Sequence, residues 1–234
     1  KLQNISIDIN HRKLVESYIN QIFESNDTTL LHDIFRAVDK IQKKSKNEIL
    51  QEYKQKGHSP EKLEKVLEFS NIKGTPSEIE KNFDTSSLNG WNELCTIYES
   101  LKNRGVDNIR INFSIVRGLD YYSGIVFEAF DTTSDLGALV GGGRYDNLPK
   151  VFGRDDLGAT GVAGGVERII LRLDEQGITC IPSSDTISIL YVNDELKSHA
   201  IYLASVLRKL GVTINIDLTG KPLKKQMEMS SNSK

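Results

Sequence analysis

The first residues alternate between apolar and polar positions, which is the pattern of a β-strand. Ile5, Ile7 and Ile9 fall on one face, and Ser6, Asp8 and Asn10 fall on the other. Successive side chains of a strand point to opposite faces, so this segment is predicted to be a half-buried strand. Asn10 is then expected to cap a helix, whose apolar positions are Leu14, Tyr18, Ile22 and Phe23.

The next segment, residues 26–84, changes to helical spacing and a polar composition. It is rich in Lys, Glu, Gln and Ser, and Gly57 to Pro60 and Gly74 to Pro76 interrupt it. Ser59-Pro60 and Thr75-Pro76 each place a capping residue before a proline at the first helical position. The pattern predicts an all-helical insertion with boundaries at 27–85. Its charges suit a solvated face, with an RNA-facing surface as the alternative.

Strand patterns dominate the centre of the chain after a predicted helix over 88–103. Ile111, Phe113 and Ile115 share one parity, and Arg117 falls on it. The residues from 115 to 130 are apolar on both faces, as in a central strand, and 136–140 reads as the antiparallel return. Gly164-Gly165 then leads into a helix with an apolar stripe at Val166, Ile169, Ile170 and Leu173. Glu167 and Arg172 are expected to pair at its surface, with no catalytic role.

The last segment has a strand–helix–strand order. Residues 186–192 read as a buried strand, 195–210 as a helix ended by Gly211, and 212–216 as a second strand, after a linker at 182–184. This order predicts a parallel α/β module that stops after one and a half units. A strand at the very start and this incomplete module at the end suggest a piece of a longer chain.

Composition narrows the class of protein only slightly. The 234 residues carry 30 basic and 32 acidic side chains, a net charge of −2, so no global basic field indicates nucleic acid. Cys95 and Cys180 lack metal-ligand spacing and read as small buried hydrophobic residues. No run reaches the length of a membrane span and no signal peptide is evident, so a cytoplasmic location is expected.

The segment from Arg117 to Tyr122, Arg-Gly-Leu-Asp-Tyr-Tyr, is the most informative about function, because it places charged and tyrosine side chains beside a glycine within an apolar strand pattern. An arginine in line with a buried row needs an anion, because an unpaired buried charge is costly. Gly118 and Gly124 remove side chains beside it, so that a ligand can lie close to the backbone. These six residues closely resemble the signature of histidyl-tRNA synthetases.

Two further blocks follow in the order of the same family. Gly141-Gly142-Gly143-Arg144-Tyr145-Asp146 resembles its second histidine-binding segment, although a glycine triplet alone is most often a turn and Tyr145 can be a plain buried tyrosine. The segment from Gly161 to Arg168 resembles motif 3 of class II synthetases, in which a strand of small residues runs into a helix with an arginine one turn from its start. A helix N-terminus and a planar cation both favour phosphate.

The resemblance implies a fold and a division into domains. The expected fold class is α+β, with part of the class II antiparallel sheet, the all-helical insertion and an incomplete α/β anticodon-binding module. The implied ranges are 1–26 and 86–181 for the catalytic core, 27–85 for the insertion and 182–234 for the anticodon-binding domain. Motifs 1 and 2 of the family, and the upstream acidic and glutamine residues that help to hold the amino acid, have no counterpart in this sequence.

The resemblance also implies the chemistry. ATP, with Mg²⁺ as its phosphate-bridging ion and no metal held by the protein, activates histidine as histidyl-adenylate. The histidyl group then passes to tRNA(His). Arg117 is the expected catalytic residue and also binds ATP with Arg168 and Gly165, while Tyr122, Tyr145 and Gly143 bind histidine. A homodimer is expected for the full-length protein, and the insertion is expected to clamp the acceptor stem of the tRNA.

Other reaction classes find little support in the sequence. It contains no phosphate-loop motif, no dinucleotide fingerprint and no His-Glu-x-x-His metal motif. The four histidines, at 11, 32, 58 and 199, lie in polar or helical contexts and are expected at the surface. The competing hypothesis is a catalytically inactive paralogue that acts as a histidine or tRNA sensor, or as a regulatory subunit. This piece by itself is expected to be inactive.

Overall fold

The computed structural model describes residues 2–42, 44–116, 122–178 and 186–231. The chain divides into two compact units, residues 1–98 with 108–178, and residues 99–107 with 179–234. Arg117, the expected catalytic residue, lies outside the described residues, as do Cys180 and the linker expected at 182–184.

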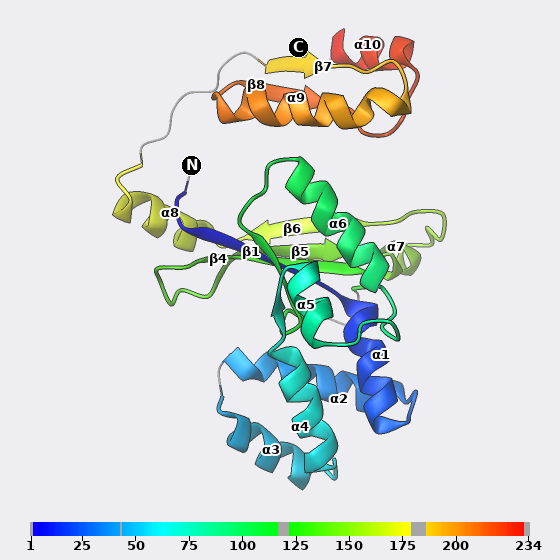
Figure 1. The fold of residues 1–234 in the computed structure, drawn as a ribbon, viewed down its shortest axis with the longest axis vertical. Coiled ribbons are helices and arrows are strands. Elements are labelled where there is room, and N and C mark those ends of the chain that lie inside the picture. The colour runs from blue at the N-terminus through cyan, green and yellow to red at the C-terminus, as the bar shows by residue number, and fades with distance from the viewer. Residues whose placement is uncertain (1, 43, 117–121, 179–185, 232–234) are drawn as a thin grey trace. The chain divides into compact units, whose positions relative to one another are not determined.

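The first unit contains a six-stranded sheet with helices around it. Its elements, some of them labelled in Figure 1, are β1 (Ile5–His11), α1 (Arg12–Phe23), α2 (Thr28–Asp39), the 3-10 helix η1 (Lys40–Gln42), α3 (Lys46–Gln55), α4 (Pro60–Ser70), β2 (Lys73–Gly74), α5 (Pro76–Asn82), the larger part of α6 (Trp91–Asn103), β3 (Ile109–Asn112), β4 (Ile125–Asp131), β5 (Ala138–Arg144), α7 (Asn147–Val151), β6 (Thr160–Gly164) and α8 (Val166–Glu175). Residues 99–103 of α6 belong to the second unit.

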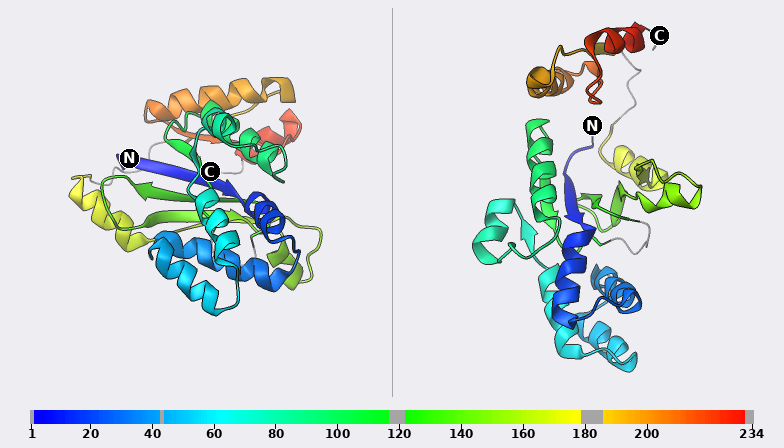
Figure 2. Two further views of the ribbon diagram at one scale, coloured as in Figure 1. Left: turned by 60° about the horizontal axis from the view of Figure 1, so that its bottom comes forward. Right: turned by 90° about the vertical axis from the view of Figure 1, so that its right-hand side faces the viewer.

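The sheet has the order β2-β3-β1-β4-β5-β6. β1 pairs in parallel with β3 and antiparallel with β4, and the pairs β4–β5 and β5–β6 are antiparallel. A mostly antiparallel sheet with helices confirms the α+β class that the sequence predicts. The two views of Figure 2 show that β1 runs directly into α1.

The polar face of β1 is buried, contrary to the half-buried strand predicted from its alternation. Asp8 is 1% exposed and Asn10 is fully buried, while Ile9 is buried on the other face. Asn10 does not cap the following helix, because α1 begins after His11 and Asn10 belongs to the strand. The polar residues of β1 therefore have partners inside the protein.

His11 is also buried, although a surface position was expected for it. Its side chain is 1% exposed, and Nε2 lies 3.2 Å from Oε2 of Glu93 on α6. Burial lowers the pKa of His11, and the nearby Glu93 carboxylate opposes this effect without cancelling it.

The insertion forms largely as its capping residues predict. Ser59 accepts a hydrogen bond from the backbone N–H of Lys62, and Thr75 forms a capping box with Glu78. The helices α2, α3 and α4 gather into one group beside α1 in Figure 1. The segment is not entirely helical, however, since the two residues of β2 pair with β3.

Aromatic rings join this helical group to the core. Phe69 of α4 stacks on Tyr18 of α1, with ring centroids 3.8 Å apart, and also contacts Phe113, at 4.7 Å. Phe69 and Phe113 are both buried. The segment predicted to be an insertion therefore shares a hydrophobic contact with the sheet, and both lie in the first compact unit.

Two expected strands have different limits in the structure. β3 ends at Asn112, and a turn follows in which the N–H of Ile115 donates to the carbonyl of Asn112. The strand parity predicted to link Ile111 with Ile115 is therefore wrong. The glycine triplet is not a loop, because residues 141–143 lie within β5.

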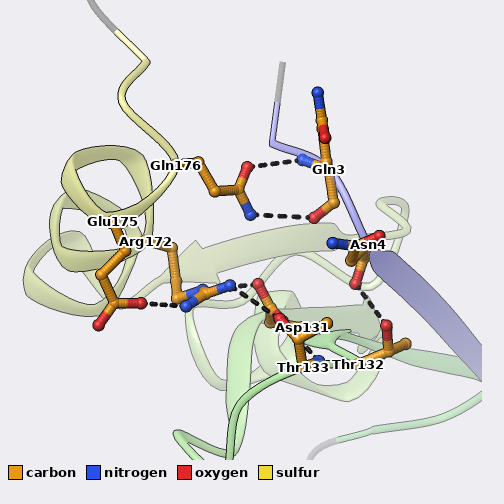
Figure 3. A network of polar contacts seen from close by, with 8 residues as sticks. All are labelled: Gln3, Asn4, Asp131, Thr132, Thr133, Arg172, Glu175 and Gln176. Carbon is orange, nitrogen blue, oxygen red and sulfur yellow. Dashed lines mark hydrogen bonds and ion pairs between the residues drawn. The ribbon is translucent and has the colours of Figure 1, made fainter.

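The helix α8 is tied to the sheet by a polar network (Figure 3). Only part of its predicted apolar stripe is covered, since Val166 and Ile170 are 63% and 50% exposed while Ile169 and Leu173 are half-buried. Arg172 is buried and its Nε lies 2.6 Å from Oδ2 of Asp131 at the end of β4. It also pairs with Glu175, so the expected surface pair with Glu167 is wrong.

The second unit contains a two-stranded parallel sheet, as the sequence pattern predicts. Its elements are β7 (Thr186–Ile189), the 3-10 helix η2 (Asp194–Leu196), α9 (Lys197–Lys209), β8 (Thr213–Ile216) and α10 (Leu223–Ser231). Gly211 follows α9 with a φ of +87°, the left-handed conformation expected of a residue that ends a helix. Gln226, buried on α10, accepts from the N–H of Tyr191 and donates to its carbonyl.

Candidate active site

A floor of small residues crosses two neighbouring strands, β5 and β6, on one face of the sheet. Gly143 pairs with Val126 and Gly161, and Gly141 pairs with Glu128 and Ala163. Directly paired residues of antiparallel strands lie on the same face, so these four small residues form one flat surface. Such a surface lets a planar ligand approach the backbone closely.

Two tyrosines close one end of this floor. The ring of Tyr122 lies over Gly143, where a Cβ would come within 2.8 Å of it, and the hydroxyl of Tyr145 lies against Gly161. The two rings meet edge to face, with centroids 6.1 Å apart and planes at 72°. Tyr122 is 4% exposed, and Tyr145 is partly buried beside the same apolar cluster. Glycine at 143 and 161 is therefore a requirement of how these rings pack.

Asp146 fixes the chain just after Tyr145. Its carboxylate accepts hydrogen bonds from Ser123 Oγ at 3.0 Å, Arg144 Nε at 2.8 Å and the N–H of Ala159 at 3.2 Å. Burial alone would raise the pKa of Asp146, but these donors outweigh it and the pKa is lowered. The ionised carboxylate thus ties the segments on both sides of the tyrosine pair.

The N-terminus of α8 closes the other end of the floor. The N–H of Gly165 donates to the carbonyl of Leu139 at 2.9 Å, which joins the start of the helix to β5. Arg168, an exposed residue, folds back over Gly165 and donates from Nη1 to the carbonyl of Ala138 at 2.8 Å. A helix N-terminus with an arginine above it is a suitable place for a phosphate group.

A pocket of about 610 Å³ opens over this end of the floor. Its walls are made by the start of β5, the end of β6, the first turn of α8, the segment after β3 and one residue of the insertion. They comprise Asp39, residues 114–116, Glu128, residues 135–141, residues 163–165 and Arg168. The volume suits a ligand of the size of a nucleotide.

The structure brings together most of the residues that the sequence singled out. Gly165 and Arg168 line the pocket, and Tyr122, Tyr145 and Gly143 form the adjoining cluster on the same floor. Gly124 faces Arg144 and His11, and it is Gly143 that lies under the ring of Tyr122. Arg117 follows Val116 directly in the chain and is outside the described residues.

Sequence reasoning missed several residues that line the pocket. Ser114, Glu128 and Asp39 contribute polar groups to its walls. Asp39 is the last residue of α2 and lies about 75 residues before Ser114 in the chain. No local sequence pattern therefore predicts that it lines the pocket. Glu128 could have been found from the strand pattern, since it is a charged position in the middle of β4, whose other residues before the terminal Asp131 are apolar.

The described part of the chain contains no group of three or more His, Cys, Asp or Glu side chains that is suited to hold a metal ion. None of its helices is both long enough and apolar enough to cross a membrane.

Comparison with known proteins gives a consistent result. Residues 1–169 match the family model described as histidyl-tRNA synthetase. The chain is 35% identical to the histidine–tRNA ligase of Pyrococcus furiosus and 33% identical to that of Pyrococcus horikoshii, in each case over 98% of this chain and 54% of the relative. It thus spans about half the length of these curated relatives.

Solved structures show the same fold. The histidyl-tRNA synthetase of Nostoc sp. PCC 7120 superposes with a TM-score of 0.63 at 25% identity, over 98% of this chain and 56% of the other. A Bacillus halodurans protein described as an ATP phosphoribosyltransferase regulatory subunit/histidyl-tRNA synthetase gives a TM-score of 0.58 at 21% identity, over 99% of this chain and 58% of the other. This second similarity concerns the fold alone.

Proposed function

Because the chain belongs to the histidyl-tRNA synthetase family, we propose that it supplies the histidine- and ATP-binding part of a histidine–tRNA ligase. The observation that carries this proposal is the floor of small residues that runs from the tyrosine pair to Arg168 at the start of α8. The floor has a polar aromatic end for an imidazole and a cationic end for a triphosphate.

In the proposed reaction, a carboxylate oxygen of histidine attacks the α-phosphorus of ATP, and pyrophosphate leaves. The adenylate then gives its histidyl group to the terminal ribose of tRNA(His), and AMP leaves. Arg117 is proposed to stabilise charge on the α-phosphate, and Arg168, with the N–H groups near Gly165, to hold the outer phosphates. Mg²⁺ enters with the nucleotide as part of the substrate.

The tyrosines are proposed to select histidine. Hydroxyl groups that read the two imidazole nitrogens would reject analogues more strongly than an apolar pocket does, because a missing hydrogen bond leaves a buried polar group unpaired. A homodimer and a tRNA contact through residues 27–85 are proposed from the family alone.

Histidine-dependent ATP–pyrophosphate exchange tests the proposal, in the longest form of the protein that its source expresses. We expect exchange in the native protein and a raised ATP KM in Arg168→Ala, with the histidine KM little changed. Arg154→Ala is the control, since Arg154 is an exposed arginine paired with Asp156 away from the pocket. Unchanged ATP and histidine KM values in Arg168→Ala would make Arg168 a structural residue.

The same assay separates the second candidate, a regulatory or sensing paralogue. The fold similarity to the Bacillus halodurans protein, whose description names a regulatory subunit, motivates this candidate. A protein that binds histidine but gives no exchange would favour the paralogue. Loss of at least about 10²-fold in exchange on Arg117→Ala would favour the ligase.

A further inference from the structure

The chain after β3 is buried without being part of the sheet. The parallel pairing of β1 with β3 reaches only to Ile9 and Ile111. Phe113, Ile115 and Val116 are nevertheless 0%, 2% and 3% exposed. Buried carbonyl groups need hydrogen-bond donors, and the strand pairing no longer supplies them there.

Asn10 supplies two of these donors from its side chain. Its Nδ2 donates to the carbonyl of Phe113 at 3.1 Å and to that of Ile115 at 3.0 Å. Its Oδ1 accepts from the N–H of His11 at 2.8 Å. Both amide hydrogens and the oxygen of this fully buried side chain are therefore in use.

A second tether holds the same segment from the other side. Oδ1 of Asn112 accepts from the N–H of Ser114 at 3.0 Å and from its hydroxyl at 2.8 Å. Nδ2 of Asn112 donates to Asp8 on β1 at 2.6 Å, and Asp8 also accepts from Nε of Arg110 at 2.6 Å. The buried polar face of β1 thus replaces the missing strand pairing.

The tethered segment is part of the candidate active site. Ser114, Ile115 and Val116 line the pocket, and Val116 precedes Arg117 in the chain. We propose that Asn10 is a positioning residue of this site, which fixes the pocket wall at 114–116 by holding the carbonyls of Phe113 and Ile115. The inference rests on the proposed function for its kinetic consequence, but its structural consequence can be measured without it.

The kinetic test uses Asn10→Leu, which keeps the size without the donors, and Asn10→Asp, which replaces the donors with an acceptor. Leu63→Ala, at a fully buried position of the insertion, controls for lost stability. At a temperature where all variants are folded, we expect kcat for exchange to fall by about 10²-fold in both Asn10 variants, because a displaced wall misplaces the reacting groups. The KM values for ATP and histidine should change much less.

The structural test is amide hydrogen exchange at Ser114 and Ile115, whose N–H groups are hydrogen-bonded within this segment. Exchange there should accelerate in the Asn10 variants and not in Leu63→Ala at matched stability. Equal rates of amide hydrogen exchange in all three variants would overturn the inference. So would a kcat for ATP–pyrophosphate exchange in the Asn10 variants that is no lower than that of Leu63→Ala. If the native protein shows no histidine-dependent ATP–pyrophosphate exchange, the proposed function fails. The rates of amide hydrogen exchange at Ser114 and Ile115 then decide the inference alone.

Discussion

At the scale of single residues, the structure gives His11 a role that its sequence context hides. The ring is buried between β1 and α6, with Glu93 at one nitrogen and Gly90 against the other. Gly90 has a φ of +88°, and a side chain there would collide with the ring. The positive charges of Lys13 and Arg144 also disfavour protonation of the His11 ring.

This burial predicts a loss of stability in mild acid. The folded-state pKa of His11 lies below the ordinary value of 6.5, so the unfolded chain binds the proton more readily. The contribution of His11 to stability is present above about pH 6.5 and declines as the pH falls below it. Urea unfolding between pH 8 and pH 5, followed by the fluorescence of Trp91, measures this in the first unit.

The variant His11→Asn should flatten the dependence of stability on pH in this range. The same substitution at exposed His199 in α9 controls for the removal of a histidine. Parallel pH profiles for native protein and His11→Asn would show that His11 does not set the acid sensitivity.

The tyrosine pair gives a second prediction at the residue scale. Tyr122→Phe and Tyr145→Phe keep the packing over Gly143 and Gly161 but remove a hydroxyl each. Each should raise the histidine KM by roughly 5–30-fold, which corresponds to about 1–2 kcal/mol of lost binding free energy, and leave the ATP KM nearly constant. Tyr121→Phe should be mild. A damaging Tyr121→Phe together with a silent Tyr122→Phe in steady-state kinetics would contradict the assignment of Tyr122, rather than Tyr121, to the histidine site.

At the scale of elements, the placement of α8 depends on a polar anchor. Arg172 reaches Asp131 at the end of β4 and Thr133 beyond it, with Nη2 2.9 Å from the Thr133 hydroxyl. At the end of the helix, the side chain of Gln176 hydrogen-bonds to both backbone groups of Gln3 (Figure 3). The anchor holds the helix whose first turn carries Arg168.

We predict that the pair Asp131–Arg172 is strongly coupled. Arg172→Met and Asp131→Asn should each destabilise the first unit, since a single substitution leaves the other member of a buried pair uncompensated. The double variant should be less destabilised than the sum of the two. The exposed pair Arg154–Asp156 is the control, and a double-mutant cycle there should show little coupling.

Stability is measured again by urea unfolding followed by Trp91 fluorescence. The ATP KM is measured in the form of the protein that shows ATP–pyrophosphate exchange. Additive effects at Asp131 and Arg172 would mean that the apolar contacts of α8, and not this pair, hold it in place.

At the scale of the whole molecule, the prediction concerns what the 234 residues can do alone. The chain spans about half the length of its curated relatives. The resemblance to the family implies that its motifs 1 and 2 have no counterpart in these 234 residues. We expect no histidyl-tRNA from the purified chain with ATP, histidine and tRNA(His), and histidyl-tRNA once the remaining family segments are present. Measurable product from the 234 residues alone would refute this.

The sequence by itself determined the parts of this protein that depend on local patterns. Helix caps such as Ser59 and Thr75 predicted where helices begin, because a capping hydrogen bond spans only three residues. The hydrophobic pattern likewise predicted the strand–helix–strand order that begins at residue 186. The three ordered motifs identified the family and indicated Tyr122, Tyr145, Gly143, Gly165 and Arg168 as candidate site residues, but not how close they lie to one another.

Only the tertiary structure decided which polar residues are buried and with what partners. Ser6, Asp8 and Asn10 read as a solvent-facing side, yet Asp8 and Asn10 bond across more than 100 residues to Arg110, Asn112 and the carbonyls beyond β3. Alternation shows that a strand has two different faces but not what covers each of them. Likewise, Asp39 enters the pocket and Arg172 finds Asp131 through contacts between distant elements. Free energies of burial depend on such neighbours, and these neighbours exist only once the chain has folded.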